Sequence, residues 1–84
     1  MHNVFLEQAA KQDLQRLPRD VFGRIIARIR SLADEPRPTG CRKISGSKSD
    51  WRIRVGDYRV IYEIDDSAER VNVMRVKHRR EAYG

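Results

Sequence analysis

The first third of the chain changes from a strand-like to a helix-like pattern of apolar residues. Residues 2–6 are rich in β-prone side chains, and apolar residues then recur at spacings of four, four and three, the period of one helix face. Pro18 interrupts this helix but suits the first turn of a new one, so we expect a second helix to start near it. The stripe of the first helix is Leu6, Ala10, Leu14 and Leu17.

A second apolar stripe at helical spacing follows, and a loop comes after it. Arg24, Arg28 and Arg30 lie mostly off this stripe, which makes the second helix amphipathic. Residues 35–50 contain two prolines, two glycines and three serines, so we expect a loop there, with a short strand at 42–44. The stripe of the second helix is Phe22, Ile25, Ile26, Ile29, Leu32 and Ala33.

In the second half of the chain the pattern has period two, which is typical of strands. In residues 51–55 apolar side chains alternate with Arg52 and Arg54, so the two arginines share one strand face and the apolar residues share the other. A Gly-Asp pair at 56–57 predicts a tight turn, and residues 58–64 alternate in the same way, which completes a hairpin. The aromatic residues expected in the core on this basis are Trp51, Tyr58 and Tyr62.

These elements together predict an α+β fold. Residues 65–69 predict another turn, and residues 71–77, rich in valine, predict a final strand. The order is then β-α-α-β-β-β, with the helical hairpin packed on one face of a small, mainly antiparallel sheet and the arginine-bearing face left open. A chain of 84 residues can bury one compact core but not two, so we expect a single domain over residues 1–84.

The charge of the chain indicates a polyanionic or acidic partner. Lysine and arginine together number 18 and aspartate and glutamate 12, which gives a net charge of +6. Arginine is the commoner cation in the second half, and its planar guanidinium binds phosphate through two parallel hydrogen bonds. We therefore expect contact with a nucleic acid, a ribosome or an acidic protein. The alternative is a surface that is basic without a specific partner.

Neither a disulfide nor a metal centre is expected. Cys41 is the only cysteine, so no internal disulfide can form, which favours a reducing cytoplasm. Cys41, His2 and His78 have no ligand spacing, so we expect no metal and no other cofactor. No apolar run is long enough for a signal peptide or a membrane span, so we expect a cytoplasmic protein without membrane contact.

Two stretches of the chain resemble a known family. Residues 51–65, WRIRVGDYRVIYEID, form the predicted hairpin, and residues 76–83, VKHRREAY, form the tail. With the preceding helical hairpin, which ends in Asp34-Glu35-Pro36, they resemble the RelE/ParE superfamily of bacterial toxins. The resemblance implies this superfamily's fold and a type II toxin that a co-expressed antitoxin keeps silent. In the RelE branch such a toxin cleaves messenger RNA in the ribosomal A site, whereas in the ParE branch it inhibits DNA gyrase.

The predicted hairpin can bring several guanidinium groups together. Arg52 and Arg54 share a strand face and Arg59 lies across the two-residue turn, so the three can converge as a phosphate clamp. The alternative is that these arginines are solvated and paired with nearby carboxylates. The catalytic residues that the resemblance implies are Arg52, Arg54, Arg59, His78 and Tyr83. Further residues expected to bind RNA are Lys43, Lys48, Lys77, Arg79 and Arg80.

One departure from RelE proper affects the expected proton transfer. RelE proper has lysines where this chain has Arg52 and Arg54. An arginine stabilises negative charge but is a poor proton carrier near neutrality, so the acid and base must come from elsewhere. Histidine has an unperturbed pKa of about 6.5, which makes His78 the leading candidate, while Tyr83 can stack on a base or orient a phosphate. The alternative is that this tail is a solvated basic strand end.

The leading hypothesis is therefore a ribosome-dependent mRNA endoribonuclease. Its expected partners are the ribosome, messenger RNA and a cognate small acidic antitoxin of the RelB type, which forms a hetero-oligomer with the toxin. A ParE-like gyrase inhibitor, which needs no catalytic residues, is one alternative. An adaptor domain that only binds an antitoxin-like helix is another. The crowding of a histidine, two arginines and a tyrosine in the tail favours the enzyme.

Overall fold

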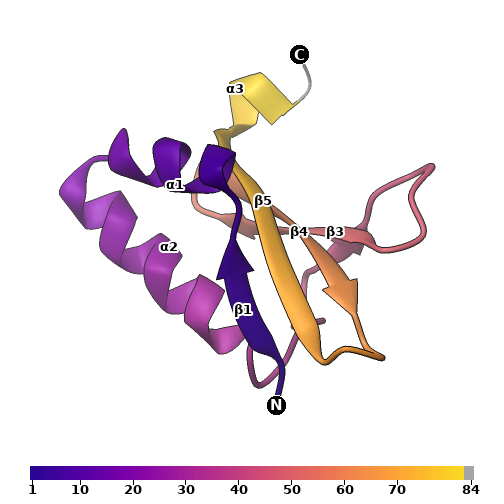
Figure 1. Cartoon of the computed structure of the whole chain (residues 1–84). Coiled ribbons are helices and arrows are strands. Elements are labelled where there is room, and N and C mark those ends of the chain that lie inside the picture. Colours follow the sequence, from indigo (N-terminus) through magenta and orange to yellow (C-terminus); the bar gives the residue numbers. More distant parts are fainter. Residues whose placement is uncertain (83–84) are drawn as a thin grey trace.

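A computed structural model describes residues 1–82 of the chain and shows two helices packed on one face of a five-stranded sheet (Figure 1). The strand order is β1-β5-β4-β3-β2, with β1 parallel to β5 and every other pair antiparallel. The predicted α+β class is confirmed, and the predicted order β-α-α-β-β-β is present together with the short strand expected at 42–44 and a final short helix that was not predicted. The elements are β1 (Asn3–Leu6), α1 (Gln8–Gln15), α2 (Arg19–Ser31), β2 (Arg42–Lys43), β3 (Asp50–Val55), β4 (Tyr58–Asp65), β5 (Arg70–His78) and α3 (Arg79–Ala82).

The N-terminal half follows the predicted periods with two differences. Pro18 is the residue that precedes α2, as expected, and Ile25 and Ile29 of this helix are buried. The assignment of Leu6 to the first helix is wrong, because Leu6 ends β1 and pairs with Val73 of β5. Parallel pairing with β5 therefore overrides the helical spacing at this position.

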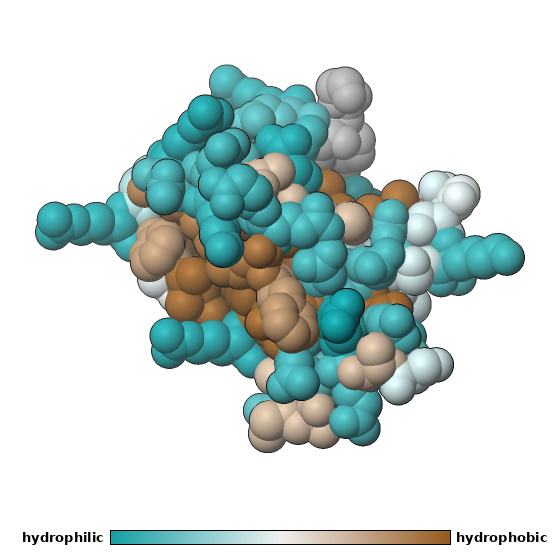
Figure 2. Space-filling model, in the orientation of Figure 1, coloured by the Kyte–Doolittle hydropathy of each residue, from teal (hydrophilic) through white to brown (hydrophobic). Residues whose placement is uncertain are grey.

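Phe22 is expected on the buried stripe of α2, yet 43% of it is exposed. A helical period gives the direction of a side chain but does not guarantee that a neighbour covers it. Figure 2 shows an apolar area in the part of the surface where α2 and β1 of Figure 1 lie side by side. Phe5 of β1 is also 48% exposed, because it alternates with Val4 and Leu6, which pack against the core, and so lies on the sheet face away from the helices.

The hairpin of β3 and β4 forms as predicted and supplies much of the core. Its two-residue turn contains Gly56, whose φ of +59° is a conformation that favours glycine. Tyr62 is fully buried, and its hydroxyl donates a hydrogen bond to the Pro36 carbonyl at 2.7 Å. Burial raises the pKa of the Tyr62 phenol. Trp51 packs against the core but is only half-buried, with the Arg37 guanidinium 5.0 Å from its ring.

Two features of the last strand were not predicted. β5 continues to His78 and is followed directly by the short helix α3. A β-bulge also interrupts its pairing with β4, because Ile61 faces Arg75 whereas Tyr62 faces Val73, which leaves Met74 as an extra residue. The extra residue shifts the alternation of β5, so that even-numbered residues after the bulge face the side that odd-numbered residues face before it. None of the helices in residues 1–82 is long and apolar enough to cross a membrane.

Candidate nucleic-acid interface

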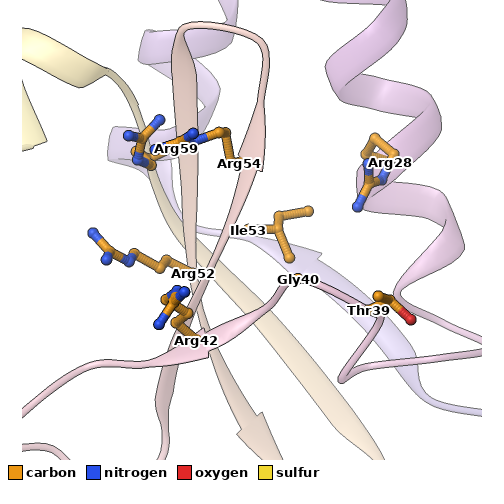
Figure 3. Close-up of a pocket in the computed structure, with 8 residues that line it drawn as sticks. All are labelled: Arg28, Thr39, Gly40, Arg42, Arg52, Ile53, Arg54 and Arg59. Carbon is orange, nitrogen blue, oxygen red and sulfur yellow. The ribbon is translucent and has the colours of Figure 1, made fainter.

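The sheet face opposite the helices carries four arginines from three adjacent strands. Arg54 of β3 lies opposite Arg59 of β4, and Arg52 lies between Arg42 of β2 and Ile61 of β4. Residues in direct register have side chains on the same face, so these guanidinium groups gather in one place. Figure 3 shows Arg54 beside Arg59 and Arg52 beside Arg42. The expected convergence of Arg52, Arg54 and Arg59 on one sheet surface is therefore seen.

Two neighbouring cavities, of about 350 and 650 Å³, open at this arginine face. Arg42, Arg52 and Arg59 line both of them. Among the residues that the structure describes, no carboxylate lines either cavity, so every charged side chain around them is positive. The smaller cavity also involves Arg28, Thr39, Gly40, Ile53 and Arg54, and the larger one involves Lys43, Ile44, Ser45 and Ile61.

Among the arginines that line these cavities, Arg59 is buried, with only 4% of its surface exposed. Its guanidinium donates a long hydrogen bond of 3.5 Å to the Tyr58 carbonyl, and it forms no ion pair with any residue of the described part of the chain. A buried charge without a counter-charge is costly, and a bound anion would remove that cost. The burial of Arg59 therefore indicates a site built for an anionic group.

Two arginines of the cavities were missed by the sequence reasoning. Arg42 enters through β2, which contributes only two residues to the sheet, and Arg28 enters from the side of α2 that faces β3. The one available signal was that Arg28 lies off the apolar stripe of its helix. That signal does not predict which strand Arg28 lies next to, because the packing of α2 on the sheet is a tertiary contact.

The other expected RNA-binding residues are spread around the arginine face. Lys43 lines the larger cavity, and Lys77 of β5 lies opposite Arg59. Lys48 is exposed in the loop between β2 and β3 and lines none of the described cavities. Arg79 and Arg80 are exposed in α3. The backbone N–H of Arg79 donates to the Asp57 carbonyl at 2.7 Å, which places α3 next to the hairpin turn.

His78 lies on the opposite face of the sheet from the arginines. Its register partner is Tyr58, and the two rings meet edge to face with centroids 5.2 Å apart. His78 lines a separate cavity of about 140 Å³ on the side of α1, which also contains Asp13, Arg16 and Glu81. The structure therefore does not bring His78 together with the arginine face. Tyr83 lies outside the described residues.

The side chain of His78 is engaged with the start of α3. The backbone N–H of Arg80 donates to Nδ1 of His78 at 3.3 Å. A side chain that accepts a hydrogen bond from the N–H two residues later acts as an N-cap of a helix. The His78 side chain therefore caps the first turn of α3.

No group of three His, Cys, Asp or Glu side chains lies close enough to hold a metal ion anywhere in residues 1–82. The site is instead defined by its cations. Guanidinium groups on an open sheet face, one of them buried, can bind phosphate oxygens and stabilise negative charge that develops on them.

Comparison with known proteins agrees with this fold. Residues 4–83 match the family described as the ParE toxin of the type II toxin-antitoxin system, parDE. Toxin RelE of Mycobacterium tuberculosis is 30% identical over 83 residues, which cover 98% of this chain and 86% of that protein. Toxin RelG of the same organism is 31% identical over 86 residues, which cover 98% of this chain and 95% of that protein.

A solved structure supports the same relationship. The archaeal RelE-RelB complex from Pyrococcus horikoshii contains a chain that superimposes with a TM-score of 0.83 and 28% sequence identity, covering 93% of this chain and 94% of that one. The similarity thus extends over nearly the whole length of both chains and includes the sheet that carries the arginines. The chain belongs to the RelE/ParE superfamily of toxins of type II toxin-antitoxin systems.

Proposed function

We propose that this toxin is a ribosome-dependent endoribonuclease that cleaves messenger RNA and thereby stops translation. The observation that carries the proposal is the arginine face, where Arg52, Arg54 and Arg59 line cavities without a carboxylate among the described residues. A gyrase inhibitor needs a protein-binding surface, whereas a buried guanidinium facing an open cavity suits an anionic substrate group. The similarity to toxins named RelE and RelG supports the same choice.

In the proposed reaction, the 2′-hydroxyl of one nucleotide attacks the adjacent phosphorus. The bond from phosphorus to the 5′-oxygen of the next nucleotide breaks, which leaves a 2′,3′-cyclic phosphate on one product. The 2′-hydroxyl gives its proton to water and the departing 5′-oxygen takes one from water, which leaves a 5′-hydroxyl on the other product. Negative charge increases on the non-bridging oxygens in the transition state, and guanidinium groups already in place lower its free energy. Arg59 suits this role because it is buried, and charge interactions are stronger where water is excluded.

The proposal is tested by adding the purified toxin to ribosomes programmed with messenger RNA and mapping new 5′ ends by primer extension. We expect cleavage within the message only when ribosomes are present. A supercoiling assay with purified DNA gyrase runs in parallel, and we expect no inhibition there. Gyrase inhibition without cleavage of messenger RNA would assign the chain to the activity of the ParE branch instead.

We also propose that the partner of this toxin is a small acidic antitoxin of the RelB type. The net charge of +6 supports an acidic partner, and the Pyrococcus horikoshii relative is a RelE-RelB complex. A tagged copy expressed in its native host is expected to co-purify with one small acidic protein, which should dissociate more easily as the salt concentration rises. A tagged toxin in which both Arg52 and Arg54 are replaced should retain less of the small acidic protein. Recovery of the toxin alone, at low salt, would contradict this prediction.

His78 is proposed to position α3 rather than to carry protons, because it lies away from the arginine face and accepts a hydrogen bond from Arg80. Asparagine is a strong N-cap residue that does not titrate, so His78→Asn should keep cleavage within a few-fold of wild type. His78→Ala, which has no acceptor, should be slower than His78→Asn. If His78 is an acid or base, both variants lose about 10² to 10⁴-fold in single-turnover rate, and the pH dependence of that rate flattens in both.

A further inference from the structure

A third cavity continues the arginine face around the edge of the sheet. It has a volume of about 340 Å³ and lies between α2 and the hairpin of β3 and β4. Arg28 and Arg54 line both this cavity and the smaller cavity of the arginine face, so the two are adjacent. Figure 3 shows Arg28 on α2, with Ile53 between it and the arginines of the sheet. The remaining residues of the third cavity are Arg24, Ala27, Val55 and Gly56.

Both walls of this groove carry arginines. Arg24 and Arg28 are one helical turn apart on α2, about 5 to 6 Å between their Cβ atoms. Arg54 of β3 lines the opposite wall, and Arg52, two residues earlier on the same strand and about 6.6 Å away, lines the adjoining cavity of the arginine face. The Arg24 guanidinium also reaches the hairpin turn, because its Nη2 lies 2.7 Å from the position that a Cβ on Gly56 would take. Both walls therefore present guanidinium groups along a short line.

The arginines of this groove differ from those that hold the fold together. Arg37 is paired with Asp66 at 2.9 Å and Arg75 with Asp13 at 2.8 Å. Arg24 and Arg28, by contrast, form no ion pair within residues 1–82, and no carboxylate of that part of the chain lines their cavity. Because like charges repel, such a cluster raises the free energy of the folded protein unless an anion binds there.

We propose that the groove between α2 and β3, with Arg24 and Arg28 as its outer wall, binds the phosphate backbone of single-stranded RNA next to the nucleotide held at the arginine face. The proposal rests on the proposed function, in that the RNA reaches the groove from that face. Arginine suits phosphate because its planar fork donates two parallel hydrogen bonds. The groove is continuous with the arginine face, because Arg28 and Arg54 line both cavities, so the chain of phosphates on either side of a nucleotide held at that face reaches it. RNA is therefore the occupant favoured over an acidic protein.

The test measures binding of the full-length chain to a fluorescent single-stranded RNA by anisotropy at several salt concentrations. The probe carries 2′-O-methyl groups and so lacks the attacking hydroxyl. For single strands, each phosphate contact contributes about 0.7 to the slope of log affinity against log salt. We expect the double variant Arg24→Gln/Arg28→Gln to lower the magnitude of that slope by about 1.4, and Arg24→Lys/Arg28→Lys to restore most of it.

A matched control comes from the same helix. Arg19 and Arg30 are exposed on α2 and line none of the described cavities. Arg19→Gln/Arg30→Gln removes the same net charge, and its slope should equal that of wild type. Equal slopes in the two glutamine variants would overturn the proposal, since only net charge would then matter. Circular dichroism and thermal unfolding establish that both variants are folded.

Two further outcomes separate this proposal from others. If polyglutamate binds with the same dependence on Arg24 and Arg28 while RNA does not, the groove belongs to an acidic protein and the proposal is wrong. The ribosome assay with wild-type toxin is independent of this measurement. A toxin that cuts no messenger RNA but shows the expected slope change refutes the proposed function and leaves the groove assignment standing, whereas cleavage with unchanged slopes refutes only the groove.

Discussion

Arg59→Gln is expected to slow single-turnover cleavage of ribosome-bound messenger RNA by about 10² to 10³-fold, the loss typical of removing one donor that stabilises transition-state charge. Glutamine keeps much of the side-chain volume but removes the charge and the planar fork. Arg59 is the buried cation of the arginine face, so its charge is the least screened by water. Growth arrest on induction, compared at matched expression, should be lost in parallel.

The burial of Arg59 makes a control of folding essential for this experiment. A surface arginine contributes about 0 to 1 kcal/mol to stability, but only 4% of Arg59 is exposed, so its replacement can also change the packing around β4. The thermal unfolding midpoint of the variant shows whether it is folded, and Arg59→Lys, which keeps the charge without the fork, provides an intermediate rate. Arg30→Gln on α2 should cleave like wild type. Undiminished cleavage by folded Arg59→Gln would remove this residue from the site.

Asp13→Ala should lower the free energy of unfolding by about 2 to 3 kcal/mol, as expected for losing several hydrogen bonds to a carboxylate. Asp13 joins α1 to β5, since its carboxylate accepts hydrogen bonds from Arg75 Nε at 2.8 Å and Arg75 Nη2 at 3.1 Å. It also accepts one from the backbone N–H of Val76 at 2.9 Å. The Arg75 side chain is 41% exposed, so the expected loss of stability is smaller than for a fully buried ion pair. Urea unfolding measures it, and Glu81→Ala in the neighbouring helix provides a control with a small effect.

The same link predicts how stability depends on pH. Burial raises the pKa of the Asp13 carboxyl, but the hydrogen bonds from Arg75 and from the Val76 N–H outweigh burial and lower it overall. Because the pKa is lower in the folded than in the unfolded chain, the stabilisation is complete above the ordinary aspartate value of about 3.9 and disappears as the pH falls through the folded value. The difference in unfolding free energy between wild type and Asp13→Asn should therefore shrink at acid pH. A difference that stays constant down to acid pH would contradict this assignment.

Local sequence patterns determined most of the elements and part of the site. The alternation of residues 51–55 and the two-residue turn at Gly56-Asp57 are local properties of the backbone. Together they required Arg52, Arg54 and Arg59 to share one face, because a tight hairpin admits only one register. The apolar spacings on either side of Pro18 determined the helical hairpin in the same way. Leu6 is the exception, because it belongs to β1 and pairs with a distant segment of the chain.

Tertiary structure alone decided which further residues line the cavities of the arginine face and on which face of the sheet His78 lies. Arg28 and Arg42 enter the cavity through packing between segments that no local pattern relates. The position of His78 depends on one residue: Val71 and Val73 point into the core, and simple alternation would turn His78 toward the arginines, but the extra Met74 shifts the alternation so that Val76 and His78 face the helices. A bulge forms where pairing with β4 requires it, and the pairing energy depends on both strands, so the broken alternation of Val71, Val73 and Val76 does not by itself fix where the bulge lies.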